Sequence, residues 1–273
     1  MSGAIQRENR ELADLMKTYF YERNEPNVSW FHAMTAYMTL LGLRGFWPMT
    51  VADDTPLYKD YGTFGLDLSA VSETGEPLLG LHNLAPYVAF DGDLTQHLFR
   101  ADHADIDIIG DEAFIAPAYR GLTVGLWAWF DALNDEEGLI SKWATSQQAY
   151  RLLKPGDNKL DFEISSTGAN TFTVSTAATI AIDKWYYIVG RFDPSTEIAI
   201  FVGEDNSLVK TTNVTSIPAT LHNSTDSLKF GLTNASDHHV GRQSFDFLCC
   251  AALPDYVIGQ LYYHSKAMYN QVP

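Results

Sequence analysis

Residues 122–130 read Leu-Thr-Val-Gly-Leu-Trp-Ala-Trp-Phe, and successive side chains of an extended chain point to opposite faces. One face of this stretch is apolar throughout, whereas the other carries Trp127 and Trp129. Because both faces carry bulky side chains, the stretch predicts a central strand that is covered on both sides or that faces a groove.

Further short strands follow on either side of this stretch, separated by turns and with almost no helix between them. We expect them at 87–90, 150–153, 159–165, 172–175, 185–192, 198–202, 228–232 and 245–250. Such a series is typical of an all-β sandwich or barrel. Residues 253–263 indicate a short closing helix with Pro254 in its first turn.

The first 42 residues have a different pattern and predict a short helical N-terminal arm. Residues 8–23 repeat apolar side chains at a spacing of three to four, which predicts an amphipathic helix; they are Leu12, Leu15, Met16, Tyr19 and Phe20. A second helix is expected from Ser29 to Gly42, and it is apolar over much of its circumference through Trp30, Phe31, Met34, Tyr37, Met38, Leu40 and Leu41. These side chains either pack on the β domain of the same chain or form an oligomerisation or docking arm.

Charge and composition exclude several classes of protein. The 273 residues carry a net charge of −16, with 18 basic and 34 acidic side chains, and show no basic stripe. Nucleic-acid binding and attraction to an anionic membrane are therefore not expected. No signal-peptide pattern and no apolar run of about 18 residues occur, so we expect neither export by a leader nor membrane insertion.

Several segments match a known family in the correct order. They are 43–49 (Leu-Arg-Gly-Phe-Trp-Pro-Met), 90–92 (Phe-Asp-Gly), 125–127 (Gly-Leu-Trp), 139–143 (Leu-Ile-Ser-Lys-Trp), 183–193 (Asp-Lys-Trp-Tyr-Tyr-Ile-Val-Gly-Arg-Phe-Asp) and 252–262 (Ala-Leu-Pro-Asp-Tyr-Val-Ile-Gly-Gln-Leu-Tyr). Together they resemble the laminin-G-like jelly roll of the concanavalin-A superfamily. The resemblance implies a two-sheet antiparallel jelly-roll sandwich over 43–266, followed by a C-terminal tail at 267–273.

A helical N-terminus that leads directly into such a jelly roll resembles proteins of tailed-bacteriophage particles. This resemblance implies a non-enzymatic virion protein that decorates a capsid or tail, made in the host cytoplasm. Its partners would be other virion proteins, further copies of itself and a cell-surface glycan. The alternatives are a free carbohydrate-binding lectin and a glycoside hydrolase of the same superfamily.

The hydrolase alternative depends on carboxylates that share one face of a strand. Glucanases of the superfamily carry Glu-x-Asp-x-Glu, in which one carboxylate attacks the sugar and another protonates the leaving group. Here the stretch reads Lys159-Leu-Asp161-Phe-Glu163, so the position of the nucleophile holds a lysine. We expect no catalytic residues and interpret this stretch as a charge-compensated, solvated face.

A glycan site would combine an aromatic platform with neighbouring amide groups. Trp143 is our candidate, together with Gln147, Gln148 and Tyr150, whereas Trp127 and Trp185 fit a packed core better. These four residues form the predicted ligand-binding site.

Metal binding has weak support in the sequence. His238 and His239 are adjacent and diverge in an extended chain, so we expect a solvated polar loop rather than a metal site. Acidic loops at 91–93, 102–107 and 135–137 leave calcium binding open, although none has the spacing of a calcium loop. We predict no cofactor.

The only two cysteines are adjacent at 249 and 250. Neighbouring side chains of a strand point to opposite faces, so we expect two free, buried thiols rather than a disulfide.

Overall fold

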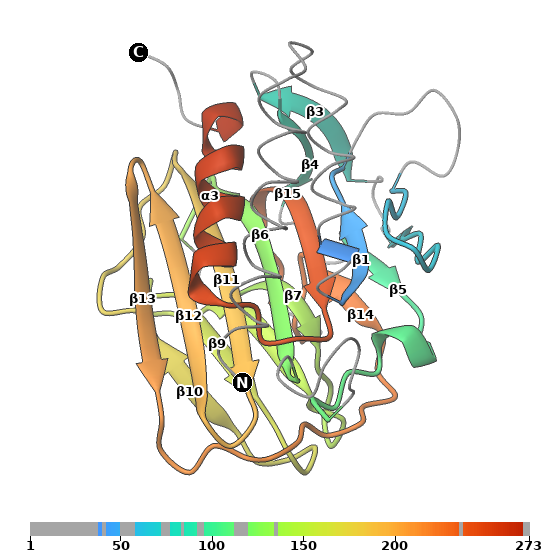
Figure 1. Ribbon diagram of the computed structural model, residues 1–273. Coiled ribbons are helices and arrows are strands. Elements are labelled where there is room, and N and C mark those ends of the chain that lie inside the picture. Colours follow the sequence, from blue (N-terminus) through green and yellow to red (C-terminus); the bar gives the residue numbers. More distant parts are fainter. Residues whose placement is uncertain are drawn as a thin grey trace, which may run out of the picture.

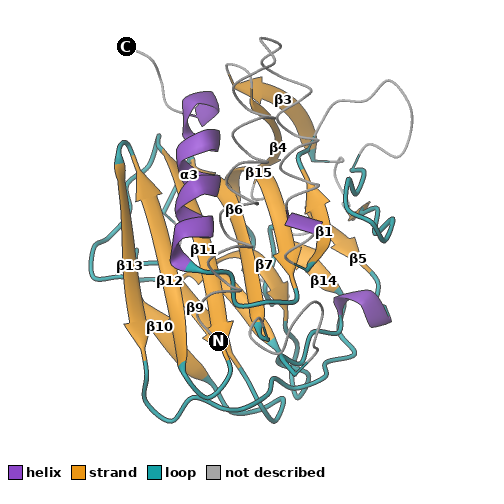
Figure 2. Ribbon diagram, viewed as in Figure 1, coloured by secondary structure: helices purple, strands orange, loops and turns teal. Residues whose placement is uncertain are grey.

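The computed structural model describes residues 38–39, 42–49, 58–71, 77–82, 85–91, 96–111, 120–133, 136–234 and 237–269. These residues form two antiparallel sheets packed face to face, with one long helix near the C-terminal end (Figures 1 and 2). The predicted two-sheet sandwich is therefore confirmed. The helices predicted for the N-terminal arm fall almost entirely outside the described residues.

The larger sheet has the strand order β13-β12-β11-β6-β15-β4-β3, and β1 pairs with β15 beside this series. Its strands are β1 (Leu43–Trp47), β3 (Leu78–His82), β4 (Ala85–Asp91), β6 (Leu122–Phe130), β11 (Trp185–Asp193), β12 (Glu197–Glu204), β13 (Ser207–Asn213) and β15 (Val240–Cys249).

The smaller sheet has the order β10-β9-β8-β7-β14-β5-β2. Its strands are β2 (Ser69–Val71), β5 (His97–Arg100), β7 (Glu137–Lys142), β8 (Tyr150–Lys154), β9 (Asp161–Ile164), β10 (Phe172–Ser175) and β14 (Leu228–Phe230). A short 3-10 turn, η1 (Ala104–Ile106), follows β5.

Strand β6 lies in the middle of the larger sheet and is buried along its whole length. Its apolar face, which includes Leu126 and Phe130, joins the core between the sheets. Its other face places Trp127 and Trp129 in a second apolar cluster on the outside of the sheet. The expectation of a central strand covered on both sides is confirmed.

The helix α3 (Asp255–Tyr269) lies across the outer face of the larger sheet (Figure 1). The Trp127 indole Nε1 donates to Ser265 Oγ at 2.9 Å, and the Trp127 ring stacks on Tyr269 with centroids 4.4 Å apart. Tyr269 is buried, so the helix continues well beyond residue 263, where we expected it to end, and three residues beyond the expected domain boundary at 266. No described helix is both long enough and apolar enough to span a bilayer.

Strand β15 contains an irregularity between Ser244 and Phe247, where Phe245 adopts a φ of 59°. Beside it, Asp246 is fully buried, and neither carboxylate oxygen has a hydrogen-bond partner. Neither cysteine is in a disulfide, both are buried, and they belong to the two different apolar clusters, as predicted.

Candidate functional site

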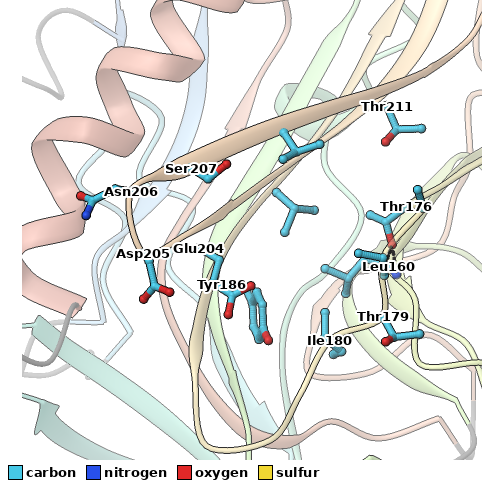
Figure 3. A pocket seen from close by; sticks show the side chains of 14 residues that line it. Leu160, Thr176, Thr179, Ile180, Tyr186, Glu204, Asp205, Asn206, Ser207 and Thr211 are labelled. Atoms are coloured by element: carbon cyan, nitrogen blue, oxygen red, sulfur yellow. Dashed lines mark hydrogen bonds between the residues drawn. The ribbon is translucent and has the colours of Figure 1, made fainter.

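An open groove of about 570 Å³ lies at the edge of the sandwich, between the β12–β13 hairpin and the segment that follows β10 (Figure 3). Its residues are Leu160, Thr176, Ala177, Ala178, Thr179, Ile180, Tyr186, Val202, Glu204, Asp205, Asn206, Ser207, Val209 and Thr211. Because the two edges belong to different sheets, the groove is the open end of the space between them.

The groove forms because the two sheets differ in length at this edge. Strands β12 and β13 have eight and seven residues, whereas β9 and β10 have four each. The hairpin therefore extends past the facing strands, and the inward-pointing side chains near its tip have no strand opposite them. Val202 and Val209, paired in register, form the apolar part of this wall.

The opposite wall is the segment 176–180, which is fixed by hydrogen bonds. Thr176 Oγ1 accepts from Leu160 N at 3.0 Å and donates to the Ala178 carbonyl at 2.8 Å, and Ile180 N donates to Asn158 O at 2.8 Å. At the base, Tyr186 Oη accepts from Ala181 N at 2.9 Å. Both walls are therefore held in place without a ligand.

The rim of the groove is polar and carries negative charge. Hydroxyl, amide and carboxylate groups surround the aliphatic floor, and Glu204 and Asp205 lie at the hairpin tip (Figure 3). Lys184 Nζ lies 2.6 Å from Glu204 Oε1, and this hydrogen bond raises the pKa of Lys184. The site thus combines an aliphatic surface with many hydrogen-bonding groups.

The predicted glycan residues do not form an exposed platform. Trp143 is 4 % exposed, and the Arg151 guanidinium lies over its ring at 4.7 Å. Tyr150 is fully buried in the core, where burial raises the pKa of its hydroxyl. Gln147 Oε1 accepts from Thr225 N at 2.9 Å, and Gln148 Oε1 is buried. The ring faces are thus occupied by protein, and we correct the prediction that Trp143 and Tyr150 present a sugar-binding surface.

One carboxylate of β9, Glu163, is paired from the neighbouring strand. Arg151 Nε donates to Glu163 Oε2 at 2.7 Å, and Arg151 NH1 donates to Glu136 Oε1 at 3.0 Å. Lys159 instead pairs with Asp157. The expected charge compensation is therefore present only at Glu163, where Arg151 supplies it, whereas Asp161 Oδ1 is buried without a hydrogen-bond partner. The Glu163 side chain is only 13 % exposed, so the face is less solvated than we expected.

Burial raises the pKa of Asp161 and of Glu136, one of the two partners of Arg151. For Asp161 the desolvation exceeds the opposing hydrogen bond from Ser175, and for Glu136 it exceeds the attraction of Arg151. Arg151 thus bridges Glu136 and Glu163 and engages a carboxylate oxygen of each.

Two carboxylates of the acidic 102–107 segment contact Lys142. The buried Lys142 Nζ lies 2.5 Å from Asp102 Oδ1, 3.0 Å from Asp107 Oδ1 and 2.8 Å from the Asp226 carbonyl oxygen. The ammonium group therefore occupies the position toward which these oxygens converge. Within the part of the chain that the structure describes, no group of three or more metal-ligating side chains is found.

The expectation of a solvated loop at His238 and His239 is wrong. Both side chains are buried. Their backbone is tied to neighbouring elements, because His238 forms a β-bridge with Leu232, His239 N donates to Gly231 O at 2.9 Å, and Val240 N donates to Glu137 at 3.0 Å. His239 Nδ1 lies 3.0 Å from Glu137 Oε2, and the buried Lys154 Nζ lies 3.6 Å from Glu137 Oε1.

Of the residues predicted for oligomerisation or docking, Met38 alone lies among the described residues. It is fully buried in the cluster on the outer face of the larger sheet, with Leu43 and Phe46. At this position the arm packs on its own β domain. The other predicted arm residues lie outside the described part of the chain: Leu12, Leu15, Met16, Tyr19, Phe20, Trp30, Phe31, Met34, Tyr37 and Leu41.

Sequence reasoning missed the groove. The alternation of β12 and β13 indicates which side chains point inward, but nothing in the sequence shows that β9 and β10 end earlier than the hairpin. The available signal was the polar stretch 203–207 (Gly-Glu-Asp-Asn-Ser) between two apolar strands, which marks a hairpin tip.

The comparisons with known proteins agree with this architecture. The sequence profile described as "Concanavalin A-like lectin/glucanases superfamily" matches residues 109–247. No curated protein matches the sequence.

Similar solved structures are toxin domains. The binding domain of Paraclostridial mosquitocidal protein 1 has 14 % identity and a TM-score of 0.62, covering 82 % of this chain and 52 % of that one. The binding domain of botulinum neurotoxin serotype G has 12 % identity and a TM-score of 0.61, covering 81 % and 50 %. The chain thus spans about half the length of these domains, and at such low identity the likeness shows the fold alone.

Proposed function

The chain belongs to the concanavalin A-like lectin/glucanase superfamily, and on this basis we propose that it is a non-enzymatic attachment module that binds a neutral glycan in the edge groove. The observation that carries the proposal is the groove itself, with its aliphatic floor and polar rim. Ligand sites commonly combine an apolar surface with a few hydrogen-bonding groups that fix orientation.

The chemistry of the groove suits a sugar. The C–H face of a sugar ring packs against side chains such as Val202 and Val209, while ring hydroxyls bond to the threonine, serine and asparagine groups of the rim. Glu204 and Asp205 accept hydrogen bonds from hydroxyls but repel anions. The proposed ligand is therefore neutral.

The absence of catalysis remains part of the proposal, and the Arg151 ion pairs support it. Glycoside hydrolysis needs one carboxylic acid and a second carboxylate flanking the scissile bond. Here Glu163 and Glu136 are both hydrogen-bonded to one guanidinium group.

Two further similar structures also concern attachment. One is a binding domain of botulinum neurotoxin DC in complex with rat synaptotagmin II, at 12 % identity and a TM-score of 0.57. Another concerns the dependence of botulinum neurotoxin C cell entry on two ganglioside molecules, at 10 % identity and a TM-score of 0.56. For the present chain we take from them only a role in attachment.

The setting that we propose is a tailed-bacteriophage particle, in which the N-terminal arm holds the jelly roll on other virion proteins or on further copies of itself. The resemblance of an apolar helical arm followed directly by a jelly roll supports this setting.

Replacement of Val209 by aspartate tests the groove. Val209 is 58 % exposed, so the change leaves the fold intact but adds a charge to the apolar part of the groove wall. We expect the Val209→Asp variant to bind its preferred neutral glycan at least about tenfold more weakly, a loss of about 1.4 kcal/mol. The measurement is a neutral-oligosaccharide array followed by calorimetry on the strongest ligand.

Val214→Asp is the matched control, because Val214 is 68 % exposed and lies outside the groove. It should bind as the unchanged chain does. The proposal is wrong if no neutral glycan binds, or if the two variants lose affinity equally.

A further inference from the structure

A row of side chains crosses the outer face of the larger sheet, away from the groove. In register from β3 to β11, the neighbouring residues are Leu78, Ala89, Arg242, Trp129 and Trp185. Strands β11 and β6 separate this row's arginine from the β12–β13 hairpin. The row therefore presents a surface that is distinct from the edge groove.

Arg242 is held between two aromatic rings. Its guanidinium carbon lies 4.9 Å from the Trp129 ring centroid and 5.2 Å from that of Tyr87. Cation–π contacts of this kind fix the plane of the group and leave its edge free to donate hydrogen bonds. The arginine is thus positioned before any ligand arrives.

The hydrogen-bonding capacity of Arg242 is left unused. The nearest carboxylate oxygen, Asp131 Oδ1, is 3.6 Å from Arg242 NH2 and accepts instead from Trp129 Nε1 at 2.8 Å. Among the described residues no side-chain hydrogen bond of Arg242 is found. The Arg242 side chain is 27 % exposed, so solvent reaches it.

Two other arginines that stack on aromatic rings differ from Arg242, because they donate hydrogen bonds to carboxylates. Arg151 lies over Trp143 and donates to two carboxylates. Arg191 lies over Phe201, donates to the Leu253 carbonyl at 2.8 Å, and is paired with Asp255 and Glu197. Both arginines donate hydrogen bonds to their carboxylates, whereas Arg242 lies within ion-pair distance of Asp131 without donating a hydrogen bond to it.

Two buried polar atoms beside this arginine also have no partner. The Trp185 indole is 6 % exposed and its Nε1 makes no hydrogen bond, and the same holds for the buried Nε2 of His82. The two rings are 5.8 Å apart. Unsatisfied buried groups are uncommon and costly, and a polar ligand atom would satisfy them. Burial and the charge of Arg242 lower the pKa of His82, so its ring is neutral at pH 7.

We propose that these five residues, Tyr87, Trp129, Trp185, His82 and Arg242, form an acid-sugar site that binds the carboxylate of an acidic sugar. We call them the Arg242 cluster. A guanidinium edge matches a carboxylate in a bidentate geometry, and the partly buried Tyr87 offers an aromatic surface beside it. The exposed Leu78, at 72 %, extends the apolar surface of the row.

A single sugar carboxylate fits the charge of the molecule better than a polyanion does. The net charge of −16 opposes any ligand that relies on long-range attraction. One partly buried, ring-stacked arginine gives short-range recognition of one carboxylate. The site lies apart from the groove, so the inference does not depend on neutral-glycan binding there.

The test is calorimetry on the full chain with matched ligands. The probes are lactose, 3′-sialyllactose and a glucuronic-acid disaccharide, so that the two acidic arms separate sialic from uronic acids. We expect at least one acidic probe to bind about tenfold or more tightly than lactose, and Arg242→Gln to abolish this difference. Arg44→Gln is the control, because Arg44 stacks on Phe64 at 5.0 Å and lies 3.7 Å from Asp105.

Three outcomes would overturn the acid-sugar site: both acidic probes bind no better than lactose, acetate competes as well as the acidic sugar, or Arg242→Gln and Arg44→Gln lose affinity equally.

A second readout needs no change at Arg242. The indole proton of Trp185, assigned with Trp185→Phe, should shift when the acidic probe binds, and a signal that stays in place contradicts the proposal. Loss of lactose binding in Val209→Asp concerns the groove alone, so the two proposals fail separately.

Discussion

The buried carboxyl groups of this domain differ in whether a basic side chain compensates their charge. Lys142 neutralises Asp102 and Asp107 from within, and Arg151 does the same for Glu136 and Glu163. Asp246 differs, because both of its oxygens are buried without a hydrogen bond, and burial holds its pKa well above the usual range. The folded protein therefore keeps a proton on Asp246 that the unfolded chain releases.

This proton makes stability depend on pH. Because the folded pKa is raised, the contribution of Asp246 is fully present below the unfolded pKa of about 3.9 and is lost as pH rises toward the folded value. Asp246→Asn removes the titration. We expect its free energy of unfolding, relative to the unchanged chain, to grow by up to about 1.4 kcal/mol per pH unit over this interval.

Urea unfolding followed by tryptophan fluorescence at a series of pH values measures this difference. Asp183→Asn serves as the control, because Asp183 is exposed and asparagine tolerates its φ of 61°. Parallel stability profiles for Asp246→Asn and the unchanged chain would show that Asp246 does not titrate as described.

For single residues, the sequence predicted burial better than it predicted which side chains bind a ligand. It placed Trp127 and Trp185 in a core and the two cysteines on opposite faces, because strand alternation fixes both. It chose Trp143 for ligand binding, yet the ring is covered by Arg151 from β8. Which arginine covers which ring depends on strand pairing, and one sequence does not give the pairing.

Elements were predicted well where their periodicity is local. The order of the strands in the sheets could not be predicted, because β15 pairs with β1, β4 and β6, which are far from it in the chain. The closing helix was expected at 253–263 and instead spans Asp255–Tyr269. Its extra turns are held by Ser265 and Tyr269, which contact Trp127 on the outer face of the larger sheet. Such a contact lengthens a helix without any signal in its own sequence.

The N-terminal arm is the element on which the assembly proposal rests. We expect the full chain to form an oligomer and a chain that begins at Met38 to be a monomer, because the removed residues carry the apolar helix face predicted for 8–23 and most of the one predicted for 29–42. The shorter chain keeps Met38, which packs in the outer cluster. Light scattering gives both masses, and near-ultraviolet circular dichroism checks the fold. Two monomers would rule out self-association through the arm.

At the scale of the whole molecule, the sandwich separates the two proposed binding surfaces. The groove opens at the edge formed by β12, β13 and the segment after β10, and the Arg242 cluster lies on the outer face across β3, β4, β15, β6 and β11. One surface is rimmed by carboxylates, and the other presents an arginine that donates no side-chain hydrogen bond among the described residues, so we expect them to select different sugars. Neither surface depends on movement of the sheets.

The central claim is that this domain binds a glycan without cleaving it. Proton NMR of the full chain with the strongest neutral oligosaccharide tests both parts in one sample. Saturation transfer from protein to sugar should be seen, and the anomeric signals of the sugar should stay unchanged over days. New reducing-end signals that disappear in the Glu163→Gln variant would contradict the account, because they would make the carboxylates held by Arg151 catalytic.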